Sequence, residues 1–264
     1  MSKEKFIVLD IEGMSGKIPY NIGFIIADRY GKIYKRYSFA LPENIYINIC
    51  QAAKTQQAVE MTAKNVQEIL KDFGNSRLKR KYKCVSNVYV INFILKLIKK
   101  YKVKKIYAYN VTFDKMELKN LFGERFAELE KLVEFCDIIP MILYTKLLTK
   151  RYVNFCIENG FTTAKGYIQT KAETVYKYLK NDTNFTEEHT GLEDVLIEYE
   201  ILLTALNTHK KIEVKPCQAW KILDNFCKEK EINYRVCYRD WETDRKSTRL
   251  NSSHITRSRM PSSA

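Results

Sequence analysis

The order of the apolar segments constrains the fold of this chain more than any other feature of its sequence. A short apolar run at residues 6–9 is followed by two further strand-like segments, 20–28 and 32–40, with a turn signal at 28–31 between them. Farther along the chain, helical patterns alternate with short strand patterns. Three strands followed by alternating helices and strands indicate a mixed α/β sheet with helices packed on it.

The later segments supply most of the expected helices. The last of them runs over 191–208, and one more pattern of helical period lies in 212–239. The expected helices cover residues 43–72, 86–101, 113–121, 138–147, 151–159, 170–180 and 191–208, and two further strands cover 105–109 and 132–136. We expect one main domain over 1–210 and a helical appendage over 211–239.

The last 25 residues differ in composition from the rest. Residues 240–264 are rich in serine, contain one aromatic side chain, Trp241, and show no apolar period. The run from Asp244 to His254 also looks like a translated sequencing-adapter read. We therefore expect this tail to be disordered or artefactual and exclude it from the fold.

The charge balance favours a polyanionic partner. The chain has a net charge of +14, from 45 Lys and Arg against 31 Asp and Glu. Such an excess suits a polyanionic partner such as nucleic acid, and a lysine-rich solvated surface is the alternative. No apolar run reaches the ~18–20 residues that span a bilayer, so we expect no membrane contact. The start of the chain does not resemble a secretory signal, and we expect a cytoplasmic protein.

Two carboxylates follow the first apolar run. Asp10 and Glu12 come at the expected end of that strand, and side chains two residues apart in a strand point to the same face. Their repulsion raises the pKa of one of them unless a cation lies between them. Mg²⁺ and Mn²⁺ prefer such oxygen ligands. A solvated surface pair is the alternative, and the flanking apolar run makes it less favourable.

Two more aspartates follow later strands. Asp114 comes after the strand 105–109 and opens a helix, where a first-turn aspartate that stabilises the helix dipole is the alternative. Asp137 follows the strand 132–136, and we expect it either to support the site or to cap the next helix.

A histidine and an aspartate meet at the start of the last long helix. Thr190 and Glu193 form a capping box, which makes His189 the N′ residue and Asp194 the N4 residue. Those two positions contact each other in a helix of this kind. An imidazole beside a carboxylate suits proton transfer from water. A surface histidine near a cap is the alternative.

Together these residues resemble the three motifs of the DEDDh 3′-to-5′ exonucleases, in the order and with the general spacing of that family. The resemblance covers about residues 5–208, and it implies a ribonuclease-H-like mixed five-stranded sheet flanked by helices. Longer runs also look similar to exonuclease-like proteins of phages and prophages. The motifs are Asp10-x-Glu12, Asn110-x-x-Phe113-Asp114 and His189-x-Gly191-x-x-Asp194.

The resemblance assigns a role to each acidic position. It implies that Asp10, Glu12, Asp114 and Asp194 hold two Mg²⁺ or Mn²⁺ ions and that His189 is the general base. Two metals with an activated water suit the hydrolysis of a phosphodiester. The chain departs from the family at Gly13, where Thr or Ser is common, and at Gly191, where Ala is commoner; since both are small, we expect the site to tolerate them.

Several other residues are expected to contact nucleic acid. Asn110 and Phe113 belong to the second motif, and a basic loop at 76–83 could follow phosphates without sequence preference. A second lysine-rich segment, 96–105, is equally well explained as the solvated face of a helix. The basic side chains expected to bind phosphates are Arg77, Lys79, Arg80 and Lys81.

The sequence favours a metal-dependent 3′-to-5′ exonuclease acting on the 3′ ends of single-stranded DNA or RNA. One alternative is an exoribonuclease that trims RNA ends, and the other is a catalytically inactive nucleic-acid-binding module of the same fold. The presence of His189 and of all four acidic residues argues against the inactive module. A polymerase or replication partner, the oligomeric state and the choice between DNA and RNA stay open at this point.

Overall fold

The computed structural model describes most of the chain outside two long segments. The described residues are 4–14, 18–44, 83–187, 191–208, 212–232 and 234. The helix expected at 43–72 falls outside them from residue 45 onward, and the expected tail, 240–264, falls outside them entirely.

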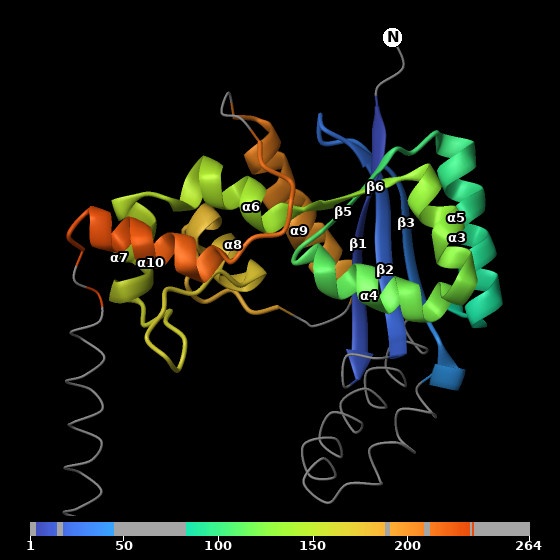
Figure 1. Cartoon of the computed structure of the whole chain (residues 1–264), viewed down its shortest axis with the longest axis horizontal. Helices are drawn as coiled ribbons and strands as arrows, with labels where there is room; N and C mark the ends of the chain where they lie inside the picture. Colours follow the sequence, from blue (N-terminus) through green and yellow to red (C-terminus); the bar gives the residue numbers. More distant parts are fainter. Residues whose placement is uncertain are drawn as a thin grey trace, which may run out of the picture. The chain divides into compact units, whose positions relative to one another are not determined.

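A mixed sheet organises the described part of the chain (Figure 1). Its strand order is β4-β3-β2-β1-β5-β6. β2 is antiparallel to both β1 and β3, whereas β5 is parallel to both β1 and β6, and β4 is parallel to β3. This is the mixed, ribonuclease-H-like arrangement that the sequence predicts. The strands are β1 (Lys5–Met14), β2 (Ile18–Asp28), β3 (Ile33–Ala40), β4 (Lys83–Cys84), β5 (Lys105–Ala108) and β6 (Glu134–Asp137).

Two details of the sheet correct the prediction. It has six strands rather than five, because the two residues of β4 pair with Phe39 and Ala40 at the edge. β1 also continues to Met14 instead of ending at Asp10. The apolar run stops there, but backbone pairing with β2 goes on, and a ladder depends on N–H and C=O groups rather than on apolar side chains.

One face of the sheet carries an extensive apolar cluster. Ile7, Leu9 and Ile11 of β1 pack there against α3 (Asn87–Tyr101), α4 and α5. Figure 1 shows these three helices beside the strands. The bounds of the other two helices are Val111–Phe122 for α4 and Phe126–Leu132 for α5. The sequence predicted α3 and α4 but missed α5.

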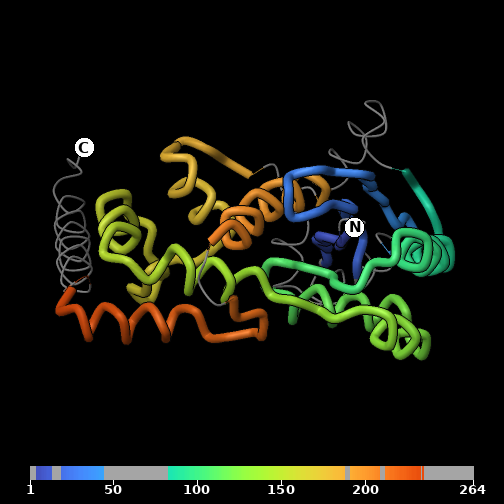
Figure 2. The backbone as a smooth tube through the Cα atoms, turned by 90° about the horizontal axis from the view of Figure 1, so that it is seen from above, coloured from blue at the N-terminus to red at the C-terminus, as the bar shows by residue number. Residues whose placement is uncertain are grey.

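The opposite face is covered by α9 (Gly191–Leu206), which comes from far along the chain. Figure 2 shows this helix, in orange, beside the blue strands β1 and β2. Tyr199 of α9 contacts the ring of Phe6 at 6.3 Å between centroids, and its hydroxyl donates to the Asp28 carbonyl at 2.7 Å. β1 is therefore covered on both faces, which explains why residues 6–9 are all buried.

The remaining helices largely agree with the sequence. The segment expected at 138–147 is α6 (Ile138–Ile142) followed by a π-helical turn, and the segment expected at 170–180 is α8 (Ala172–Lys180). The turn at 28–31 closes the expected hairpin, where Asp28 Oδ1 accepts the backbone N–H groups of Tyr30 (2.8 Å) and Lys32 (3.2 Å). No helix in the described ranges is long and apolar enough to cross a membrane.

The chain divides into two compact units. The first contains Met1–Leu147 and Lys171–Cys217 and includes the whole sheet, and the second contains Leu148–Thr170 and Gln218–Ala264. The second unit includes the helices α7 (Lys150–Glu158) and α10 (Ala219–Glu229). The helix α10 lies within 212–239, the segment in which the sequence predicts one more helix. The domain boundaries at 210 and 239 stay predictions.

Candidate metal centre

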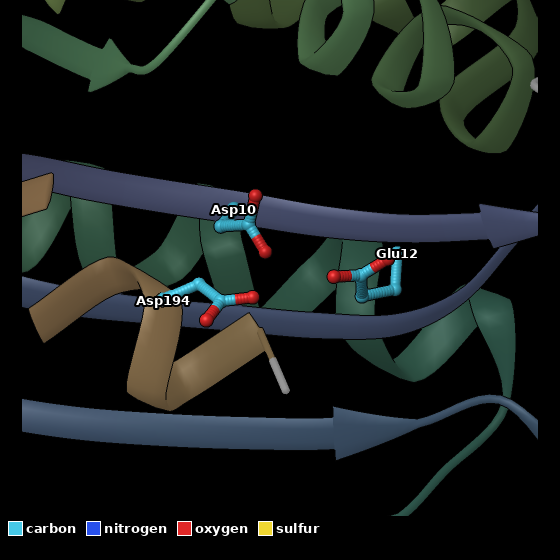
Figure 3. Close-up of side chains that lie close together, drawn as sticks. All are labelled: Asp10, Glu12 and Asp194. Carbon is cyan, nitrogen blue, oxygen red and sulfur yellow. The ribbon is translucent and has the colours of Figure 1, made fainter. Parts of the chain in front are cut away.

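Three carboxylates converge where β1 meets the first turn of α9. One oxygen each of Asp10, Glu12 and Asp194 lies within 4.8 Å of the others. Figure 3 shows Asp10 and Glu12 side by side on β1, with the Asp194 carboxylate pointing toward them from the helix. The structure therefore brings together three of the four metal ligands that the resemblance implies.

Asp114 reaches the same part of β1 from α4. Its Oδ1 accepts the backbone N–H of Ile11 at 3.1 Å, between the two acidic residues of the strand. β1 pairs with β5 only at Ile7 and Val8. Because β1 extends past the end of β5, the Ile11 N–H has no strand partner on that side, and the aspartate takes the place of a strand carbonyl.

Burial and like charge raise the pKa values of this cluster. Burial raises the pKa of Asp10 well above its usual range, and the neighbouring carboxylates Glu198, Glu12, Asp114 and Asp194 raise it further. The Asp10 Oδ2 atom is buried and accepts no hydrogen bond from the described residues. A group of acids in this state is costly to ionise without a compensating cation.

The pKa of Asp114 is also raised well above its usual range. Burial is the main cause, and the charges of Glu12 and Asp137 add to it, while backbone N–H groups, including that of Ile11, act in the opposite direction. The side chain is only 2% exposed. Since all of these ligand atoms are carboxylate oxygens, the site fits Mg²⁺ or Mn²⁺ rather than a metal that prefers sulfur or nitrogen.

Two residues of β2 hold the helix that carries Asp194. Asn21 is paired with Glu12 and Gly23 with Asp10 in the β1–β2 register. The Asn21 side chain accepts the Gly191 N–H at 3.0 Å and donates to the Phe39 carbonyl at 3.0 Å. The two acidic residues of β1 therefore lie directly beside the residues that hold the start of α9.

The backbones of β2 and α9 come unusually close at this point. A Cβ added to Gly23 would lie 2.0 Å from the Gly191 carbonyl carbon and 2.2 Å from the Leu192 nitrogen. A Cβ added to Gly191 would lie 2.7 Å from Asn21 Oδ1 and 2.8 Å from the Gly23 nitrogen. The neighbours of position 191 therefore leave no room for a methyl group, which explains why this chain has Gly where Ala is commoner in the family it resembles.

Sequence reasoning missed a fifth acidic residue, Glu198. It lies one helical turn after Asp194 on α9 and is 4% exposed. Burial raises its pKa well above the usual range, and the charges of Asp114 and Asp194 add to that effect. The signal was present in the sequence, because an Asp and a Glu four residues apart share the otherwise apolar face of this helix.

Of the other predicted residues, some are described and some are not. Asn110 is exposed and has a left-handed backbone conformation (φ 65°) at the turn before α4, and Phe113 is half-buried. Asp137 caps α6, where its Oδ1 accepts the backbone N–H groups of Ile139 (2.9 Å) and Asn110 (3.2 Å). It therefore serves both as a helix cap and as a support for the turn that precedes Asp114. Outside the described residues lie His189, Arg77, Lys79, Arg80 and Lys81.

The lysine-rich segment 96–105 lies away from the acidic residues. Its lysines occupy the end of α3 and the approach to β5, whereas the acidic residues lie beyond the opposite end of β5. Lys99 forms an ion pair with Glu128 of α5 at 3.3 Å, with both side chains largely exposed. These positions favour the interpretation of a solvated helix face over that of a phosphate track.

Comparisons with known proteins find similarity only among solved structures. No protein-family model and no curated protein matches the chain. Similar structures include Escherichia coli Exonuclease I in complex with a dA16 oligonucleotide, at 14% identity and a TM-score of 0.45 over 78% of this chain and 41% of that one. The same enzyme with a dT13 oligonucleotide gives 16% identity and a TM-score of 0.44 over 77% of this chain. The chain thus spans about two-fifths of the length of these proteins.

Proposed function

We propose that this protein is a metal-dependent 3′-to-5′ exonuclease that acts on single-stranded nucleic acid. The observation that carries the proposal is the approach of Asp10, Glu12 and Asp194 within 4.8 Å of one another. Asp114 joins them through the Ile11 N–H. Four buried or half-buried carboxylates in one place favour a cation site over a structural one, because packing alone would not collect like charges.

The roles of the chain's own residues in this reaction would be as follows. Asp10, Glu12, Asp114 and Asp194 would hold two Mg²⁺ or Mn²⁺ ions. Such ions supply charge stabilisation and a lowered pKa for attacking water. Asn21 and Gly23 fix the helix that carries Asp194. His189 precedes the first residue of that helix by two positions, and we propose it as the general base on the strength of the family motif.

The polarity of cutting and the substrate rest on the motif resemblance and on the charge. A net charge of +14 suits a polyanionic substrate. The presence of every acidic residue of the motif supports an active enzyme over an inactive binding module. Oligomers of dA and dT, and the matching RNA oligomers, are the substrates to test first.

The decisive experiment compares oligonucleotides labelled at either end. DNA and RNA strands carrying a 5′ or a 3′ label are incubated with the protein in Mg²⁺, in Mn²⁺ and in EDTA. We expect a ladder that shortens from the 3′ end, only when a divalent ion is present. Asp10→Asn should remove the activity, because it removes a ligand and a charge while keeping the size of the side chain.

A matched control uses an acid on the outer side of α9. Glu200 is exposed and pairs with Lys180 at 2.5 Å. Glu200→Gln should therefore cut at the wild-type rate. If Asp10→Asn retained that rate as well, the acidic cluster would not be the site of hydrolysis.

A further inference from the structure

The carboxylate of Glu198 is buried in surroundings that disfavour a negative charge. It is 4% exposed, lies one turn beyond Asp194, and forms no ion pair with any other described residue. Its neighbours on the same helix include the buried apolar residues Val195 and Leu202. An ionised carboxylate in such surroundings is unfavourable unless a positive charge compensates it.

The two sides of this carboxylate differ. The backbone N–H of Tyr109 donates a hydrogen bond to it, which links α9 to the turn between β5 and α4. The other oxygen, Oε2, is buried and has no hydrogen-bond partner among the described residues. Buried acceptors of this kind are rare in folded proteins, and each one calls for an explanation.

The charges that act on Glu198 are those of the acidic cluster. Asp114 and Asp194 are its strongest charged neighbours, and Glu198 is the strongest charged neighbour of Asp10. Glu198 is not one of the three residues whose oxygens lie within 4.8 Å of one another. Its charge acts on the cluster although, like Asp114, it is not one of those three residues.

We propose that Glu198 is a positioning residue of the cation site, which raises the affinity for divalent ions through its negative charge and the free acceptor Oε2. This inference rests on the proposed function. The Tyr109 N–H donates to this carboxylate, Oε2 has no partner among the described residues, and the charges of Asp114 and Asp194 act on it. Groups that support metal ligands in this way commonly change metal affinity when they are replaced.

The alternative is that Glu198 only anchors the Tyr109 turn, and the glutamine variant separates the two roles. Glu198→Gln keeps the shape and an oxygen acceptor for the Tyr109 N–H but removes the charge. Glu198→Asp keeps the charge but shortens the side chain, so that it weakens the anchor. Glu200→Gln, on the outer side of the same helix, controls for the loss of a charge from α9.

The test measures Mn²⁺ binding to the full chain without nucleic acid. Free Mn²⁺ is followed by electron paramagnetic resonance during a titration, and the rise in melting temperature on adding Mn²⁺ gives a second measure. We expect Glu198→Gln to weaken Mn²⁺ binding by about 10- to 100-fold and to reduce that rise. Glu198→Asp should bind more tightly than Glu198→Gln, and Glu200→Gln should bind like wild type.

The outcomes separate this inference from the proposed function. If Asp10→Asn loses Mn²⁺ while Glu198→Gln binds it like wild type, only the role of Glu198 is overturned. Equal weakening in Glu198→Gln and Glu198→Asp would also overturn it, because the charge would then not be the cause. A wild-type chain that binds no Mn²⁺ would overturn the proposed function, and the inference with it.

Discussion

Replacing Gly23 with alanine tests whether the contact between β2 and α9 builds the metal centre. The added methyl would lie 2.0 Å from the Gly191 carbonyl carbon, whereas carbon atoms pack at about 3.5 Å or more. Both atoms in the clash belong to backbone or are fixed to it, so no side chain can turn away. The first turn of α9 must therefore move by about 1 Å or more, and Asp194 lies in that turn.

Two quantities should change together in Gly23→Ala. Overpacking of this kind costs about 1–3 kcal/mol, which lowers the melting temperature of a chain of this size by roughly 2–12 °C. A shift of ~1 Å in a ligand or reacting group costs about 10²-fold in rate. We therefore expect Mn²⁺ affinity and the rate of hydrolysis to fall far more than the loss of stability alone explains. Calorimetric titration measures the affinity, labelled oligonucleotides measure the rate, and thermal melts measure the stability.

Gly31→Ala provides the control. Gly31 lies in the hairpin turn with φ +88° and has open space around its Cβ position. Alanine there is strained by about 1–2 kcal/mol but does not touch α9, so it should lower the melting temperature and leave Mn²⁺ binding unchanged. If Gly23→Ala bound Mn²⁺ as tightly as wild type, the close contact would not set the position of Asp194.

Two further predictions concern proton transfer and pH. His189→Ala should lower turnover by ~10²–10⁴-fold and leave Mn²⁺ affinity nearly intact; an unchanged pH–rate profile would reduce His189 to a helix-start residue. Burial and like charge raise the pKa values of Asp10, Asp114 and Glu198 in the folded chain. Between the ordinary and the raised pKa values, the folded, metal-free chain therefore binds more protons than the unfolded chain. The free energy of unfolding should therefore fall as pH rises through the raised values. In EDTA, the melting temperature of Asp10→Asn should fall less steeply with pH than that of wild type, and equal slopes would show that the cluster does not titrate as described.

Local patterns predicted the parts of the site that lie within single segments. The spacing of Asp10 and Glu12, and the position of Asp114 at a helix start, could be interpreted from a few residues each. The end of β1 could not be predicted in this way, because its last residues are held by backbone pairing with β2 rather than by apolar side chains. β4 is too short to have a pattern of its own.

The partners across the fold had no local signal. Asn21 looks like an ordinary polar residue of a strand, and its importance comes only from the docking of α9 against β2. Gly23 and Gly191 are small because two backbones meet there, and that meeting depends on the tertiary structure. Glu198 differs, since its spacing from Asp194 places both acids on an apolar helix face, and that spacing alone is enough to predict a buried acid.

The hydrogen bond from the Gly191 N–H to Asn21 joins residues that are 170 positions apart in the chain. At ~5–20 residues per second, a ribosome needs about 10–30 s to make the intervening segment. During that time α9 has not yet been synthesised, so it cannot pack on the face of β1 that carries Asp10 and Glu12. Assembly of the proposed cation site is therefore among the last events of folding, and a chain interrupted before α9 would carry three of the four proposed ligands but lack Asp194.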